Sequence, residues 1–260
     1  MTTDPALYRL LAWSSPGYPT GAFSYSHGLE WAVETGDVKD LQGLLDYVTA
    51  VISRGGGWVD AVLFAHAWHA TSTVRDTLRP HTHDSGTPAP AAEPSALSAL
   101  PGPATPATLD SLTQLAAAFR GSSETALESR QQGGAFLDVT RKAWPHPTLE
   151  AFATRQAQTA TPVAHCIAVA VACAAHEIPL EPALNAYIHA VAANLVSAGA
   201  RLIPLGQTQA QIAIAQLAPV ITDIAERAQT TSLDDLGTAA PAIELCSLRH
   251  ETQYTRLFRS

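Results

Sequence analysis

The stretch SAGARLIPLGQTQAQ (residues 197–211) separates two long helical segments and decides how the chain folds on either side of it. Residues 182–200 contain no Asp, Glu, Lys or Arg, so they predict a buried helix. Residues 208–229 predict a second helix. Alanine is abundant throughout the chain, while runs of Val, Ile, Tyr and Phe are few, and this favours packed helices over a sheet. We therefore expect an all-α fold.

Arg201 begins an elbow between these two helices. Pro204 cannot donate a helical hydrogen bond, and Gly206 is the usual residue where a backbone turns left-handed. Arg201 is expected at the negative end of the first helix dipole, where a cation is stabilised. The elbow is either an ordinary capped turn, which the physics of the stretch alone favours, or a surface that presents Arg201 and Gln207 to a partner.

Apolar spacing predicts further helices, in one domain of about ten helices without internal repeats or strand–hairpin alternation. Asp40 is expected to cap one helix, and Ser24 another that stops at Gly36. The glycine pair 133–134 is expected to mark a kink or a close helix contact. The expected ranges are 6–13, 25–35, 41–52, 58–70, 109–119, 123–141, 149–159 and 163–176.

Residues 79–108 differ in composition from the rest of the chain. They contain seven of the eighteen prolines, among Ala, Ser, Thr and Gly, with almost no large apolar residue. Such a segment cannot bury enough apolar surface to offset the entropy of ordering it. We expect a flexible Pro/Ala-rich insertion within a helical domain of residues 1–246. At His81, His83 and Asp84 a solvated loop is favoured over a metal site.

Composition bounds the class of protein. A chain of 260 residues with 47% hydrophobic content can bury a sizeable core, and a net charge of −8 argues against nucleic acid as the main partner. Cys166, Cys173 and Cys246 form neither a CxxC pair nor an even framework, which is typical of reduced cytosolic thiols. The N-terminus lacks signal-peptide features, and the apolar run 162–175 is too short to span a bilayer. We expect a soluble cytoplasmic protein without a membrane partner.

Candidate metal ligands are weak. His165 and His176 share a helical face, but at about 1.5 Å rise per residue they lie roughly 16 Å apart. Cys173 with His176, and His66 with His69, are closer pairs, yet two ligands alone make a poor site. The sequence therefore predicts no resident metal.

Candidate catalytic groups are equally weak. Ser24 and Ser26 lie beside His27, but no strand precedes them to form a nucleophile elbow. The chain has no GxxxxGK[ST] loop for phosphate, and His250-Glu251 is not followed by the second histidine of HExxH. We expect neither catalytic residues nor a cofactor, although a missing motif does not exclude an all-α hydrolase.

The last stretch, LRHETQYTRLFRS (residues 248–260), is locally cationic in an acidic chain. Tyr254, Leu257 and Phe258 follow helical spacing, among three arginines. A frayed terminus is the simplest interpretation. Aromatic residues with Arg are, however, typical interface anchors, so we favour a segment that orders on an acidic partner. We treat residues 247–260 as a partner-binding tail.

Four motifs stand out: SSPGYPTGAFSYSHGLEWAVETGDV near the N-terminus, SSETALESRQQGGAF in the middle, the elbow SAGARLIPLGQTQAQ and the terminal RHETQYTRLFRS. Together they resemble the UreF family of urease accessory proteins. The resemblance covers nearly the whole chain except residues 79–108. The position of Arg201 is often Lys in this family, so its charge is kept.

The resemblance implies an all-α homodimer without catalytic activity. It would link a UreG-like nickel-carrying GTPase to UreD (UreH in some species) on apo-urease and control GTP hydrolysis during nickel delivery. The face for the GTPase would include Arg201, Pro204, Gly206 and Gln207, with Glu30 a weaker candidate. The face for UreD/UreH would be the tail, with Arg249, Glu251, Tyr254, Arg256, Phe258 and Arg259.

Two alternatives concern mechanism and class. Arg201 could reach a nucleotide as an arginine finger, or it could pair with carboxylates of the GTPase and shift its switch loops. We prefer the second, because Arg201 follows a buried helix without a long loop to project it. The competing class is a nickel-binding carrier that uses His81, His83, Cys173 or His176.

Overall fold

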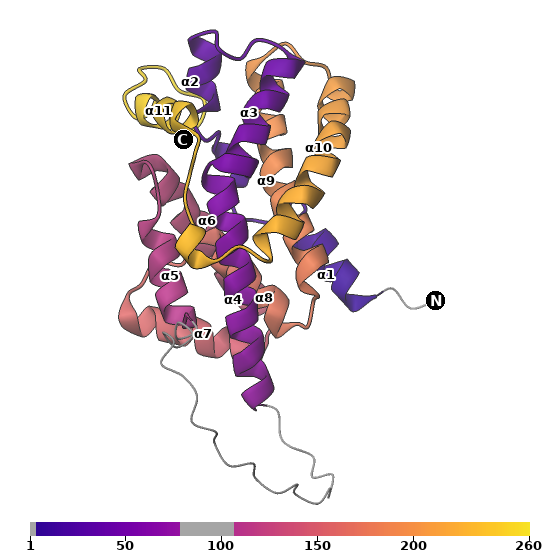
Figure 1. The fold of residues 1–260 in the computed structure, drawn as a ribbon, viewed down its shortest axis with the longest axis vertical. Helices are drawn as coiled ribbons and strands as arrows, with labels where there is room; N and C mark the ends of the chain where they lie inside the picture. The colour runs from indigo at the N-terminus through magenta and orange to yellow at the C-terminus, as the bar shows by residue number, and fades with distance from the viewer. Residues whose placement is uncertain (1–3, 79–106) are drawn as a thin grey trace, which may run out of the picture.

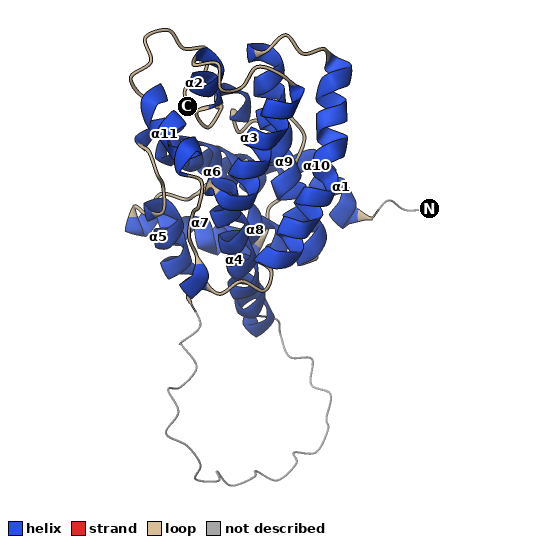
Figure 2. Ribbon diagram, turned by 45° about the horizontal axis from the view of Figure 1, so that its top comes forward, coloured by secondary structure: helices blue, strands red, loops and turns tan. Residues whose placement is uncertain are grey.

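The computed structural model describes residues 4–78 and 107–260, which form eleven α-helices and two short 3-10 turns, without a strand (Figures 1 and 2). The all-α prediction is confirmed. The α-helices are α1 (Pro5–Trp13), α2 (Leu29–Glu34), α3 (Leu41–Arg54), α4 (Gly56–Leu78), α5 (Leu109–Ala118), α6 (Ser123–Ala143), α7 (Pro147–Thr159), α8 (His165–Ala175), α9 (Leu180–Leu202), α10 (Gln207–Ala228) and α11 (Pro241–His250). The 3-10 turns are η1 (Ala22–Ser24) and η2 (Leu233–Asp235).

Helix α8 forms the centre of the core. Every residue from Cys166 to Ala175 is buried, and α4 and α6 pack against the helix (Figure 1). Its many alanines allow this close approach. A Cβ added at Gly133 of α6 would lie 2.0 Å from the Val163 carbonyl oxygen, whereas one at Gly134 would meet nothing within 4 Å. Of the two roles expected for the glycine pair, Gly133 therefore serves a close contact.

Of the two helix caps predicted from sequence, one is confirmed and the other is wrong. Asp40 caps α3 as expected, since its Oδ1 accepts from the Gly43 nitrogen at 2.9 Å. The prediction that Ser24 caps a helix from residue 25 is wrong, because α2 begins at Leu29. His27 (φ 53°) and Gly28 (φ 77°) are both left-handed, and no helix can continue through them. Gly36 ends the segment in a left-handed conformation, as expected.

The predicted insertion mostly lies outside the described residues, which omit 79–106 and with them His81, His83 and Asp84. Its last residue, Thr108, belongs to the fold. The Thr108 hydroxyl oxygen accepts from the Ser111 nitrogen at 3.2 Å and caps α5.

The expectation of a tail that stays unfolded until it binds is wrong. The boundary between residues 246 and 247 falls inside α11, and His250, Phe258 and Ser260 are buried. Figure 1 shows the chain end folded back between α11 and α2. The physical reason is a set of buried carboxylates that bond to this segment.

Residues 41–76, which span α3 and most of α4, are long and apolar enough by composition to cross a membrane. Two thirds of the qualifying window is buried inside the fold, which the core of a helical domain explains equally well.

Candidate partner-binding surface

The elbow, residues 201–206, is built largely as expected. Helix α9 ends at Leu202, Ile203 is buried, and Pro204 and Gln207 are exposed. Gly206 is exposed too, but its φ of −76° is not left-handed, so that expectation is wrong. Gly206 instead caps α10, with its nitrogen donating to the Gln209 side chain at 3.0 Å.

Arg201 is held in place by three contacts. Its Nη1 donates to the Phe23 carbonyl oxygen at 3.0 Å and its Nε to the Ser197 carbonyl oxygen at 3.2 Å. Its guanidinium carbon lies 4.5 Å from the centre of the Phe258 ring, a cation–π distance. The elbow and the chain end, predicted as two separate faces, therefore meet at Arg201.

Glu30 is buried, with 7% of its surface exposed, so it does not lie on an open face as expected. Its carboxylate accepts from the nitrogens of Leu257 at 2.6 Å and Phe258 at 2.8 Å, and contacts His250 Nε2 at 3.1 Å. Sequence reasoning missed this role. The available signal was an acidic residue on the apolar side of a short helix, LEWAVE.

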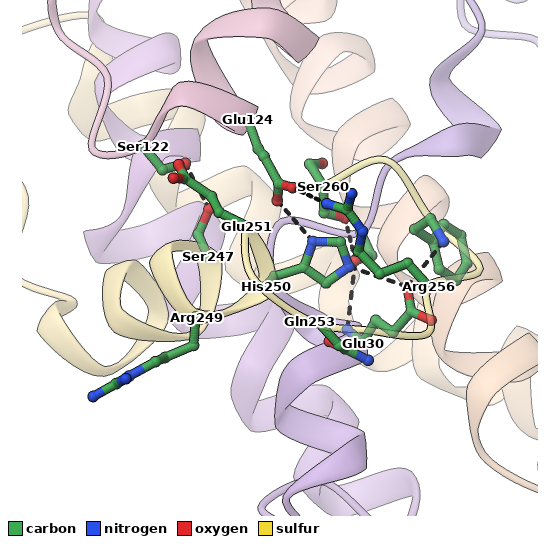
Figure 3. Close-up of polar contacts among 12 residues, drawn as sticks. Glu30, Ser122, Glu124, Ser247, Arg249, His250, Glu251, Gln253, Arg256 and Ser260 are labelled. Carbon is green, nitrogen blue, oxygen red and sulfur yellow. Dashed lines mark hydrogen bonds and ion pairs between the residues drawn. The ribbon is translucent and has the colours of Figure 1, made fainter.

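His250 is fully buried between two carboxylates (Figure 3). Its Nδ1 lies 2.7 Å from Glu124 Oε2, opposite the contact to Glu30. Glu124 also pairs with Arg256 at 2.7 Å. Each ring nitrogen of His250 thus faces one carboxylate, and Glu124 has a second partner in Arg256.

The last two residues pair with residues 24–26. The Arg259 nitrogen donates to the Ser24 carbonyl oxygen at 2.8 Å, and the Ser26 nitrogen to the Ser260 carbonyl oxygen at 2.7 Å. The Ser260 hydroxyl donates to Glu128 Oε2 at 2.9 Å. This pairing explains the strained backbone before α2: residues 24–28 are shaped to receive the chain end rather than to extend a helix.

The predicted tail residues divide into exposed and occupied groups. Phe258 is buried, and Glu251 accepts from the nitrogen and hydroxyl of Ser123, both at 2.8 Å, at the start of α6. The Arg259 guanidinium lies 5.9 Å from the Tyr25 ring. Tyr254 is fully exposed and Leu257 is 64% exposed. Arg249, Arg256 and Arg259 are also exposed.

A cavity of about 450 Å³ lies beside this junction, and the titratable residues in its lining include His27, Asp60, Arg120, Glu128 and His165. Its charges are paired: Arg120 lies 2.8 Å from Asp60, and His27 lies 3.0 Å from Glu128. Burial lowers the pKa of His165 to about 4. Burial also opposes the charge of His27, but Glu128 outweighs it and the pKa of His27 is raised.

The metal and catalytic candidates are engaged elsewhere. Cys173 is fully buried, and burial raises the pKa of its thiol. His176 Nε2 bonds to the Trp144 carbonyl oxygen at 3.1 Å, and burial lowers its pKa to about 4. Across the described ranges, no three His, Cys, Asp or Glu side chains are grouped to hold a metal. Ser26 bonds to the chain end and His27 to Glu128, so they form no nucleophile–base pair.

Comparison with known proteins matches the resemblance. The family model for UreF matches residues 38–218. The urease accessory protein UreF of Rhodopseudomonas palustris (strain BisB5) is 43% identical, over 98% of this chain and 91% of its own length. That of Granulibacter bethesdensis is 46% identical, over 100% and 96%. That of Bradyrhizobium diazoefficiens is 41% identical, over 98% and 92%. The chain belongs to the UreF family of urease accessory proteins, which serve urease maturation and are not themselves catalytic.

Proposed function

We propose that this protein is a cytoplasmic homodimeric scaffold that links a UreG-like GTPase to a UreD/UreH-like protein on apo-urease and modulates GTP hydrolysis during nickel insertion. The observation that carries the proposal is the contact between Arg201 and Phe258, which joins the elbow to the chain end. Two segments far apart in sequence thereby share one exposed surface.

The composition of this surface suits acidic protein partners. Leu257 and Tyr254 offer exposed apolar area, and Phe23, whose carbonyl oxygen holds Arg201, is 67% exposed. Arg249 and Arg259 add exposed cations to a chain of net charge −8. Aromatic residues with arginine are frequent energetic anchors of interfaces, and complementary charge speeds association.

The contacts of Arg201 favour surface pairing over an arginine finger. Its guanidinium is engaged by two carbonyl oxygens and a ring, so reaching a nucleotide would first break all three contacts. Arg201→Lys keeps the charge, and we expect it to retain regulation of GTP hydrolysis. Complete loss of regulation in this variant, with binding retained, would favour the finger instead.

Assembly can be measured by light scattering after size exclusion, with the UreG-like and UreD/UreH-like proteins of the same organism. We expect a complex with two copies of each protein. Tyr254→Ala and Leu257→Asp should lose the UreD/UreH-like protein without loss of helical content. Tyr8→Ala on α1, which removes another exposed tyrosine, is the matched control. A folded wild-type protein that binds neither partner would refute the scaffold.

The nickel-carrier alternative finds little support among the described residues, since Cys173 is fully buried and His176 bonds to the Trp144 carbonyl oxygen. Equilibrium dialysis of the isolated protein with nickel separates the two functions. Tight stoichiometric binding would favour the carrier, and weak binding together with complex formation would favour the scaffold.

A further inference from the structure

We infer that Glu30 and His250 are positioning residues: they fix residues 254–260 against α2 and α6, and through Phe258 they set the orientation of Arg201. The contacts run from the buried carboxylate of Glu30 to the exposed guanidinium of Arg201. We call the contacts of Glu30 and His250 with residues 254–260 the latch, and it can be measured on the isolated protein. Its effect on partner binding rests on the proposed function, so the latch and the proposed function can fail separately.

The first step is the carboxylate of Glu30. It accepts two consecutive backbone N–H groups, from Leu257 and Phe258, and contacts Nε2 of His250. A carboxylate can accept both N–H groups, one on each oxygen, because it carries only acceptor sites. An amide of the same size offers one oxygen and turns an N–H₂ donor toward the remaining N–H group. Glu30→Gln therefore removes the latch while nearly keeping the side-chain volume.

The second step is the set of contacts around His250. Its ring bridges Glu30 on α2 and Glu124 on α6, and Arg256 completes the set on Glu124 (Figure 3). A buried carboxylate is tolerated when paired and is strongly destabilising when its partner is removed. His250 and Arg256 are therefore needed together with the two carboxylates, and these contacts hold the chain end between α2 and α6.

The third step reaches the elbow. The Phe258 nitrogen is fixed by Glu30, and its side chain is only 3% exposed, with Arg201 over the ring. If residues 254–260 leave this position, Arg201 loses its ring contact and keeps only bonds to two carbonyl oxygens. A change at buried Glu30 thus alters an exposed arginine that it does not touch.

Hydrogen exchange with mass spectrometry tests the latch. In Glu30→Gln, amides of residues 254–260 should exchange at least tenfold faster than in the wild type, while amides of α8 keep their protection. Glu34→Gln is the matched control, because Glu34 is an exposed carboxylate on the same helix. Unchanged exchange at the chain end of a folded Glu30→Gln variant would overturn the inference. So would an equal rise in α8, which indicates general destabilisation.

Chemical modification tests the link to Arg201. Phenylglyoxal reacts with accessible guanidinium groups, and modification at Arg201 can be followed by peptide mass. We expect Glu30→Gln and Phe258→Ala each to raise its rate several-fold, and Glu34→Gln to leave it unchanged. Faster exchange at residues 254–260 without any change at Arg201 would overturn the third step.

Discussion

Gly28→Ala probes how closely the segment before α2 approaches α11. Gly28 has a φ of 77°, and an added Cβ would lie 2.5 Å from the Ser247 nitrogen and 2.7 Å from the Cys246 carbonyl carbon. Alanine in a left-handed conformation costs about 1–2 kcal/mol. Moving the backbone of α11 adds about 1–3 kcal/mol, the usual range for overpacking. We expect Gly28→Ala to lower the free energy of unfolding by about 3 kcal/mol.

Gly21→Ala is the matched control, because Gly21 has a φ of 75° but an added Cβ would meet nothing within 4 Å. Gly21→Ala should lower the free energy of unfolding only by the cost of a left-handed alanine, about 1 kcal/mol. Urea denaturation followed by circular dichroism at 222 nm (a standard helix signal) gives both values. If the two variants lose the same stability, the close approach of α11 to Gly28 does not constrain the fold.

Three further perturbations follow from the core. Gly133→Ala should lower the free energy of unfolding by more than about 4 kcal/mol, because its Cβ would lie 2.0 Å from a carbonyl oxygen. Gly134→Ala should be neutral or stabilising by up to about 1 kcal/mol. Similar losses of stability in the two variants would contradict this. Arg120→Ala removes the ion-pair partner of buried Asp60 and should lower the free energy of unfolding by about 3–5 kcal/mol. A loss below about 1 kcal/mol would indicate that the pair is solvent-exposed. The pKa of His165 is lowered to about 4 by burial, so the unfolded chain binds its proton first as pH falls. Stability should therefore decrease from about pH 6.5 toward pH 4, by up to about 3 kcal/mol from this residue, and His165→Gln should flatten the pH dependence.

Local rules predicted most helices. Asp40 caps α3 because its short carboxylate reaches the Gly43 nitrogen, and that pattern is readable from sequence. The uncharged residues 182–200 of α9 form a helix with one buried face, and alanine-rich α8 is buried along nearly its whole length, as their composition indicates. The missed cap at Ser24 has a long-range cause: residues 24–26 bond to residues 259–260, more than 230 positions away. No local propensity contains that information.

At the candidate surface, too, local features were predictable from the sequence and long-range contacts were not. Sequence and family resemblance identified Arg201 and the chain end as exposed features, and the exposure of Arg201 and Tyr254 agrees with this. Their contact through Phe258, and the burial of Glu30, depend on tertiary packing. Glu124 and Glu128 lie four residues apart on one face of α6, so a shared acidic face was readable from the sequence, but its burial was not. What they bond to was not.

We propose that the elbow and the chain end act as one surface for the GTPase. The most direct measurement is the affinity of the UreG-like GTPase for the full chain and for a chain ending at Gln253, which keeps α11 but lacks Phe258. Circular dichroism verifies that the shortened chain stays helical. We expect at least a tenfold weaker affinity for the shortened chain, because Arg201 loses the ring that orients it. Equal affinity for both chains would contradict it and make the elbow an independent site.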